Sequence, residues 1–124
     1  MKIQESAENY LETILILQKT LNAVRSIDIV NELNYTKASV SIAMKKLREN
    51  GYIEMDKDGY ISLTKAGLAI AEKMYERHET LSSFLMFLGV NKKTSLEDAC
   101  RIEHVISDES FDKIKKYIMT LPKH

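Results

Sequence analysis

The hydrophobic period of this chain changes near residue 51, and this change limits the possible folds. Before that point, apolar residues recur every three to four positions, as on one face of a helix. Two short β-prone runs follow, 52–55 and 60–63, and the Asp58-Gly59 pair between them is a strong β-hairpin signal. Helical periodicity then resumes. With only four glycines and one proline in the chain, we expect a mainly α protein with a single hairpin.

Three helices are expected before the hairpin. The first spans 6–20, the second is short and has Ser26 as its N-cap, and the third spans 37–50 with Thr36 as its N-cap. Helix, short helix, turn, helix and hairpin is the order of a winged helix-turn-helix, which here occupies 6–63. In that arrangement the helix at 37–50 enters the major groove of DNA.

Three more helices are expected after the hairpin. The first is long, about 65–88, with Thr64 before it and Gly89 after it. Ser95 and Asp98 resemble a capping box that starts a helix over about 96–106. The last helix begins at Ser107 or Asp108 and stops before Pro122. We therefore expect a DNA-binding domain over 1–64 and a second, helical domain over 65–124.

The distribution of charge favours a nucleic-acid partner, although the total charge does not. Eighteen basic and eighteen acidic side chains cancel, but between Thr36 and Arg48 there are four basic residues and no acid. Neutralisation of phosphates supplies most DNA affinity, so a basic recognition helix is the expected pattern. Ile42 at the centre of this face is unusual, because it can only pack on a thymine methyl group. The candidate DNA contacts are Ser26, Thr36, Lys37, Ser39, Ser41, Ile42, Lys45, Lys46 and Lys57. The alternative is that the lysines form a solvated face.

The most informative segment is 97–104, Glu-Asp-Ala-Cys-Arg-Ile-Glu-His. Cys100, Glu103 and His104 stand at i, i+3 and i+4, so on a helix they share one face. A thiolate, a carboxylate and an imidazole together suit a transition metal such as Fe(II), Co(II), Ni(II) or Zn(II). His78 by itself is more often a core histidine, and Glu12 and Asn9 by themselves are typical surface residues.

Two other uses of these residues stay open. One is a winged-helix regulator that senses an organic ligand or cysteine oxidation, with Cys100, Glu103 and His104 merely structural. The other is a small enzyme with Cys100 as nucleophile and His104 as base, but no oxyanion motif or substrate-pocket signal accompanies the pair. The single cysteine excludes an intrachain disulfide and is compatible with the cytoplasm. No signal peptide or membrane-spanning run is visible.

The order of these motifs resembles the diphtheria toxin repressor family, which contains iron-dependent repressors and manganese transport regulators. The most specific piece is 97–109, supported by 9–12, 77–79 and 61–67, and the similarity runs from about Ser6 to Leu121. The resemblance implies a short form without the SH3-like third domain. It also implies a winged helix-turn-helix domain followed by a helical metal-binding and dimerisation domain.

The resemblance implies a ligand set and also shows departures from it. Cys100, Glu103 and His104 match ligands of the iron branch, His78 matches a histidine that binds metal throughout the family, and Glu12 matches a carboxylate ligand of the manganese branch. Asn9 stands where the iron branch has Met and the manganese branch has Asp. Cys100 replaces the Glu typical of the manganese branch, so the ligand set is a hybrid. Ser82 and Leu96 replace two ligands of the iron branch's ancillary site, which implies that this site is absent in its usual form.

The function expected from these observations is a cytoplasmic homodimer that binds a palindromic double-stranded operator when divalent metal is present. The resemblance implies Fe(II) or Mn(II) as the physiological metal, with Co(II), Ni(II) or Zn(II) able to substitute, and no membrane or small organic substrate is expected. Protonated His78 or His104 cannot bind metal, so metal affinity falls at acid pH. The dimer interface is expected to use Phe84, Phe87, Leu88, Phe111, Ile118 and Leu121. The alternative is that some of these residues fill the core of the monomer.

Overall fold

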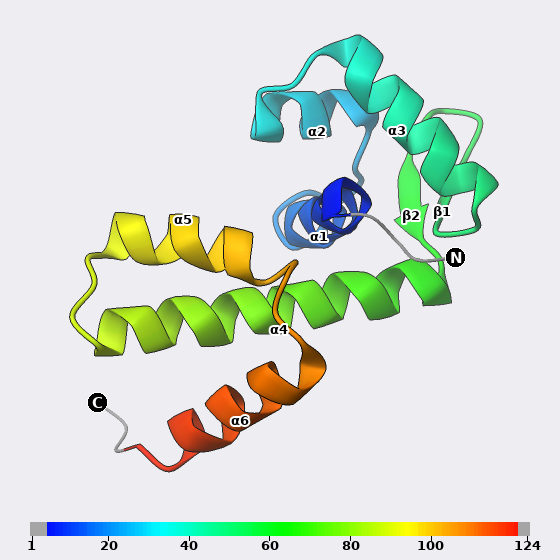
Figure 1. Ribbon diagram of the computed structural model, residues 1–124. Coiled ribbons are helices and arrows are strands. Elements are labelled where there is room, and N and C mark those ends of the chain that lie inside the picture. Colours follow the sequence, from blue (N-terminus) through cyan, green and yellow to red (C-terminus); the bar gives the residue numbers. More distant parts are fainter. Residues whose placement is uncertain (1–4, 122–124) are drawn as a thin grey trace. The chain divides into compact units, whose positions relative to one another are not determined.

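A computed structural model describes residues 5–121 (Figure 1). Within this range the chain forms a two-stranded sheet and six helices, in the order α1 (Glu5–Gln18), α2 (Ser26–Leu33), α3 (Lys37–Glu49), β1 (Ile53–Met55), β2 (Ile61–Leu63), α4 (Lys65–Phe87), α5 (Lys92–Ile102) and α6 (Asp108–Met119). The mainly α architecture that begins with a winged helix-turn-helix is confirmed. The chain divides into two compact units inside α4, between Lys73 and Met74. No helix of the described residues is long and apolar enough to span a membrane.

The first unit packs α1, α2, α3 and the hairpin around one apolar core. Its innermost side chains are Leu11, Ile14, Val24, Ile29, Val40, Met44 and Ile53. The hairpin is antiparallel, with Met55 opposite Ile61, and Gly59 turns the chain with a φ of 84°. The Ile61 N–H also donates to the carbonyl of Val24 at 2.7 Å, which ties the hairpin to the segment between α1 and α2.

Local hydrogen bonds set where the recognition helix begins. The Thr36 hydroxyl accepts from the Ser39 N–H at 3.1 Å, so Thr36 is the N-cap of α3, as predicted. The turn before it is held by an edge contact between the rings of Tyr35 and Tyr10 of α1, with centroids 5.9 Å apart. Burial, and then the neighbouring Tyr35, raise the pKa of Tyr10 above its usual value of 10.0. Tyr10 therefore stays neutral at physiological pH.

The prediction that Ser26 is the N-cap of α2 is wrong. Ser26 is the first helical residue, and the cap is Arg25, which has extended backbone angles. The Arg25 N–H donates to the carboxylate of Asp28 at 2.8 Å. The acid three residues after the cap thus satisfies the backbone at this end, and no hydroxyl is needed at the cap.

The second unit contains the C-terminal part of α4, α5 and α6. Its core is formed by Leu81, Ala99 and Phe111, with Ile102, Ile106 and Ile114 packed around them. Ser107 is the N-cap of α6, because its hydroxyl accepts from the Ser110 N–H at 3.1 Å, which agrees with the prediction. Pro122, expected to mark the end of this helix, lies outside the described residues.

The predicted start of α5 is wrong. The helix begins at Lys92, because the Asn91 side chain accepts from the Thr94 N–H at 2.9 Å and caps it. Ser95 lies inside the helix, fully buried, and its hydroxyl donates to the carbonyl of Val90 at 3.2 Å. The sequence signal failed because Ser95 has the residue type of a cap but uses its hydroxyl on the preceding turn.

Candidate metal centre and nucleic-acid interface

The last turn of α5 and the residues after it carry the three predicted metal donors. The helix ends at Ile102, so Glu103 and His104 do not lie inside a helix over 96–106 as expected. Glu103 nevertheless keeps helical backbone angles, φ −56° and ψ −28°, and its N–H donates to the carbonyl of Ala99 at 3.0 Å. The helical spacing of Cys100, Glu103 and His104 therefore survives the end of the helix.

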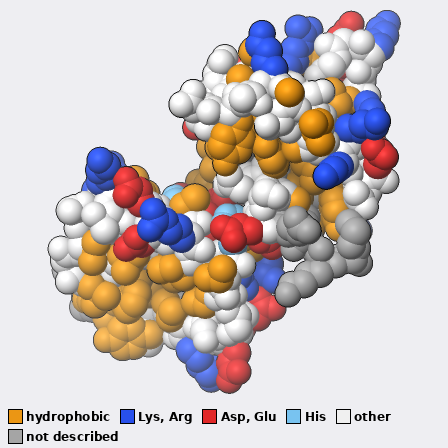
Figure 2. Space-filling model, turned by 45° about the horizontal axis from the view of Figure 1, so that its top comes forward, with side chains coloured by type: hydrophobic (Ala, Val, Ile, Leu, Met, Phe, Trp, Pro, Cys, Tyr) orange, Lys and Arg blue, Asp and Glu red, His pale blue; other side chains and the backbone are white. Residues whose placement is uncertain are grey.

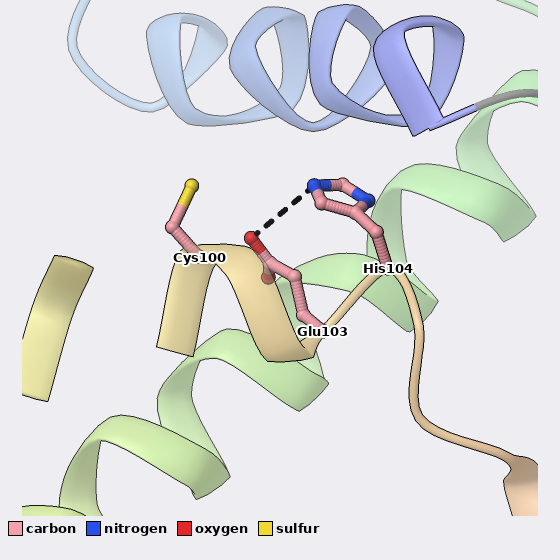
Figure 3. A group of neighbouring side chains, drawn as sticks. All are labelled: Cys100, Glu103 and His104. Carbon is pink, nitrogen blue, oxygen red and sulfur yellow. Dashed lines mark ion pairs between the residues drawn. The ribbon is translucent and has the colours of Figure 1, made fainter. Parts of the chain in front are cut away.

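The three donor groups converge. One ligand atom each from Cys100, Glu103 and His104 lie within 4.8 Å of one another. Figure 3 shows the three side chains directed to the same side of the chain. The distance from His104 Nε2 to Glu103 Oε1 is 3.6 Å, and the Glu103 side chain is completely buried, whereas Cys100 is exposed. A sulfur, an oxygen and a nitrogen donor at this separation fit a transition-metal ion.

His78 of α4 adds a second imidazole to this group. Its Nδ1 atom lies 3.8 Å from Glu103 Oε2, and it makes no hydrogen bond to any described residue. A buried nitrogen without a hydrogen bond is rare in proteins, and it needs a partner such as a cation or an unseen water. The Glu103 carboxylate, with an imidazole near each oxygen, is the kind of oxygen ligand such a cation requires.

The remaining predicted ligands are Glu12 and Asn9, and the two positions where an ancillary site is expected to be absent are Ser82 and Leu96. Glu12 and Asn9 lie on α1 in the first unit, where Glu12 is buried and Asn9 half-buried, and their role as ligands stays a prediction. Ser82 and Leu96 belong to the second unit. The Ser82 hydroxyl donates to the carbonyl of Glu79 in its own helix at 3.2 Å, and Leu96 has no donor atom. These two positions supply no strong ligand.

Arg77, which was not among the predicted site residues, organises the turn that carries the donors. Arg77 is only 5% exposed. Its Nη1 donates to the carbonyls of Glu103, at 3.0 Å, and Ile106, at 2.8 Å, and its Nη2 pairs with the carboxylate of Asp108. No pattern in the sequence marks this role, because the partners lie 26 to 31 residues further along the chain.

The recognition helix presents a basic and hydroxyl-rich face to solvent. Six of the predicted DNA contacts are exposed on α3, namely Lys37, Ser39, Ser41, Ile42, Lys45 and Lys46, and Lys57 is exposed in the hairpin turn. Figure 2 shows Lys and Arg side chains standing out from the surface of the first unit. Ile42 is 58% exposed, so it is not a core residue. The predicted DNA-contact face of α3 is therefore exposed to solvent.

A pocket of about 240 Å³ lies beside this face. Its lining residues are Ser26, Ser41, Ile42, Met44, Lys45, Arg48 and Met55. Ser26 of α2 therefore lies beside the basic residues of α3. This proximity was not evident from the sequence. Arg48, absent from the predicted contacts, joins Lys45 here, and their spacing of three residues on a helix is the signal that identifies it. The Thr36 hydroxyl, by contrast, is engaged with Ser39.

The second unit exposes apolar side chains at its surface (Figure 2). The most exposed are Phe87, Leu88, Val105, Tyr117 and Met119. Phe111, expected in a dimer interface, is instead a core residue, because it packs on Leu81 and Ala99. Phe84 is half-buried and makes an edge contact with Tyr117, at 6.4 Å between ring centroids.

Comparison with known families assigns both halves of the chain. Residues 2–61 match the N-terminal DNA binding domain of iron dependent repressors, and residues 64–123 match their metal binding and dimerisation domain. The chain therefore belongs to the iron dependent repressor family, a family of metal-dependent transcriptional regulators. Its members bind DNA and are not enzymes, so the nucleophile hypothesis for Cys100 has no support.

Individual relatives agree with this assignment. An HTH-type transcriptional regulator of Methanocaldococcus jannaschii is 34% identical over 118 residues, which is 94% of each chain. The HTH-type transcriptional regulator MntR of Listeria welshimeri is 33% identical over 96% of this chain and 84% of its own. The first of these similarities spans nearly the whole length of both proteins.

Solved structures share the fold. The manganese regulator SloR is 26% identical, with a TM-score of 0.82 over 98% of this chain and 56% of its own. A manganese-dependent transcriptional repressor in complex with manganese is also 26% identical, with a TM-score of 0.84 over 93% of this chain and 53% of its own. The present chain thus spans just over half the length of these two proteins.

Proposed function

We propose that this protein is a transcriptional repressor whose binding to a DNA operator requires a divalent metal. The observation that carries the proposal is the buried Glu103 carboxylate, which has an imidazole near each oxygen and the exposed Cys100 thiol close by. The winged helix in the same chain supplies the surface that such a signal would control. A regulator that senses an organic ligand or cysteine oxidation instead gains no support from the family relationships.

The proposed ligands are Cys100, Glu103, His104 and His78, with Glu12 and Asn9 of the first unit completing the set as the family resemblance implies. We propose Fe(II) or Mn(II) as the physiological metal. The thiol of Cys100 favours Fe(II), because thiolates prefer softer ions whereas Mn(II) prefers oxygen donors. The bound metal would stabilise the DNA-competent arrangement of the chain and so shift the population towards it.

The proposed DNA complex is a homodimer on a palindromic operator. Two recognition helices of a dimer must lie about 34 Å apart to enter successive major grooves. The proposed phosphate contacts are made by four lysines and four hydroxyls: Lys37, Lys45, Lys46, Lys57, Ser26, Thr36, Ser39 and Ser41. The Thr36 hydroxyl also caps α3, so it contacts DNA only as far as this hydrogen bond allows. Ile42 is proposed to pack on a thymine methyl group.

Replacement of Cys100 by serine tests the metal centre directly. Titration of Co(II) into the reduced, metal-free protein under anaerobic conditions should produce an intense near-ultraviolet band from thiolate-to-metal charge transfer. The band should vanish in Cys100→Ser, since Cys100 is the only cysteine in the chain. Binding without the band in the wild type would indicate a carboxylate and histidine site of manganese type, and absence of binding would contradict the metal switch.

Replacement of Lys45 by alanine tests the DNA interface. Each phosphate contact adds about 0.9 to the steepness with which log affinity falls as log salt concentration rises. Lys45→Ala should therefore make this dependence shallower by about 1 and reduce the affinity for all DNA sequences by a similar factor. Fluorescence anisotropy with labelled DNA at several salt concentrations measures this. The control is Lys92→Ala in α5, which removes the same charge far from α3 in the sequence. If both variants changed the salt dependence equally, Lys45 would not be a specific phosphate contact.

A further inference from the structure

Arg77 is a buried cation that the proposed metal centre does not use as a ligand. It lies on α4, directly before His78, and only 5% of its surface is exposed. Its Nη1 donates to two backbone carbonyls of the segment between α5 and α6, those of Glu103 at 3.0 Å and Ile106 at 2.8 Å. A single guanidinium therefore bridges the two ends of the turn that carries Glu103 and His104.

The same side chain also reaches the first turn of α6. Its Nη2 pairs with the carboxylate of Asp108, the first residue of that helix, and its guanidinium lies over the ring of Phe111 at 5.5 Å. Phe111 is part of the core of the second unit. Arg77 thus joins three elements: the helix that carries His78, the turn that carries Glu103 and His104, and the start of α6.

The chemistry of the guanidinium explains why arginine suits this position. Its rigid, planar fork of N–H donors serves two carbonyls and a carboxylate at once, whereas a lysine ammonium is a compact point charge on a flexible stem. Backbone carbonyls in the interior of a protein need donors, and here the donor is a side chain from another helix. Without it, the turn would lose the bonds that hold its backbone against α4.

We propose that Arg77 is a positioning residue for the metal centre, which holds Glu103 and His104 in place and couples metal binding to α6. The inference rests on the proposed function, because it requires that Glu103 and His104 bind metal. Coupling between two sites is reciprocal, so metal bound at the turn should stabilise the first turn of α6, and a weakened turn should lower metal affinity by the same factor.

The test compares two neighbouring positions on α4 in the full chain. Arg77→Lys keeps the charge and removes the fork. The control, Glu76→Gln, breaks an exposed ion pair with Lys115, 3.2 Å long, which also joins α4 to α6 but does not touch the turn. Co(II) titration should show about tenfold weaker binding in Arg77→Lys, as for loss of a group that orients a ligand, and no change in Glu76→Gln.

Hydrogen exchange of backbone amides distinguishes loss of coupling from a general loss of stability. In the wild type and in Glu76→Gln, Co(II) should slow exchange of the backbone amides over 105–111. In Arg77→Lys this metal-dependent protection should disappear from the α6 residues, even at Co(II) concentrations that saturate the site. A uniform rise in exchange with the metal-dependent difference retained would overturn the proposal, because it would indicate lost stability without lost coupling.

Three other outcomes of the Co(II) titration bear on the proposal. Unchanged Co(II) affinity in a folded Arg77→Lys variant overturns the proposal. If that variant does not fold, Asp108→Asn replaces it; affinity about threefold weaker than in Glu76→Gln supports the proposal, and equal affinity overturns it. Failure of the wild type to bind Co(II) would be a different result, since it would reject the proposed metal switch itself.

Discussion

Replacement of His104 by alanine is expected to abolish metal-stimulated DNA binding while the protein stays folded. The His104 side chain is 2% exposed, and its Nε2 lies 3.6 Å from the buried carboxylate of Glu103. Loss of a group that merely orients a ligand lowers metal affinity about 10- to 100-fold, so loss of a ligand itself should exceed about 100-fold. Metal titration followed by anisotropy with labelled DNA measures both consequences.

Two further variants separate ligand loss from damage to the fold. His104→Gln preserves most of the side-chain volume but replaces the imidazole with a poor ligand, so it should behave like His104→Ala. Arg101→Ala removes an exposed side chain from the same end of α5 and should leave metal binding within twofold of the wild type. Circular dichroism and sedimentation would verify that all three variants fold and dimerise alike. An unchanged metal response in His104→Ala would remove this residue from the site.

Replacement of Gly67 by alanine is expected to destabilise the winged-helix unit strongly. Gly67 lies in the first turn of α4, and a Cβ atom there would clash with the carbonyl oxygen of Tyr52 and come within 3.0 Å of its carbon. The Tyr52 backbone cannot retreat easily, because its carbonyl accepts from the Thr64 N–H at 3.1 Å and its N–H donates to the Leu47 carbonyl at 2.9 Å. Both bonds would have to give way.

The size of this effect follows from two opposing contributions. Alanine stabilises a helix by about 1 kcal/mol relative to glycine, whereas forced overpacking costs about 1–3 kcal/mol and occasionally more. Because the clash is with a backbone carbonyl and not with a flexible side chain, the cost should lie at the upper end of this range. We therefore expect a net loss of about 2 kcal/mol in the free energy of unfolding, measured by urea denaturation. Ala69→Ser, at an exposed position of the same helix, should change stability by less than about 0.5 kcal/mol. A gain in stability for Gly67→Ala would contradict the close approach.

The order of the elements in the first unit was predictable from local features of the sequence. Hydrophobic period, the cap at Thr36 and the Asp58-Gly59 turn are local features, since each depends on residues within a few positions of one another. The same holds for Cys100, Glu103 and His104, whose convergence follows from helical spacing over five residues. Their closeness survived even though α5 ends at Ile102, because Glu103 continues the helical backbone angles.

Predictions of helix caps were wrong where more than one nearby side chain was able to cap the same helix end. Ser26 and Ser95 both have the residue type of a helix cap, but Asp28 satisfies the start of α2 and Asn91 the start of α5. Phe111 was expected in a dimer interface, but the fold places it in the core of the second unit. A pattern of residue types shows which groups are able to cap or pack, and neighbouring groups then decide which of them does so.

The contacts between distant segments became visible only in the folded chain. The fold placed the imidazole of His78 beside Glu103, 25 residues further along the chain, and brought Arg77 to the carbonyls of the turn. It also set Ser26 beside the basic face of α3 in one pocket. Such contacts arise because helices bury their apolar faces against one another, and the polar groups carried with those faces are paired only when the packing is complete.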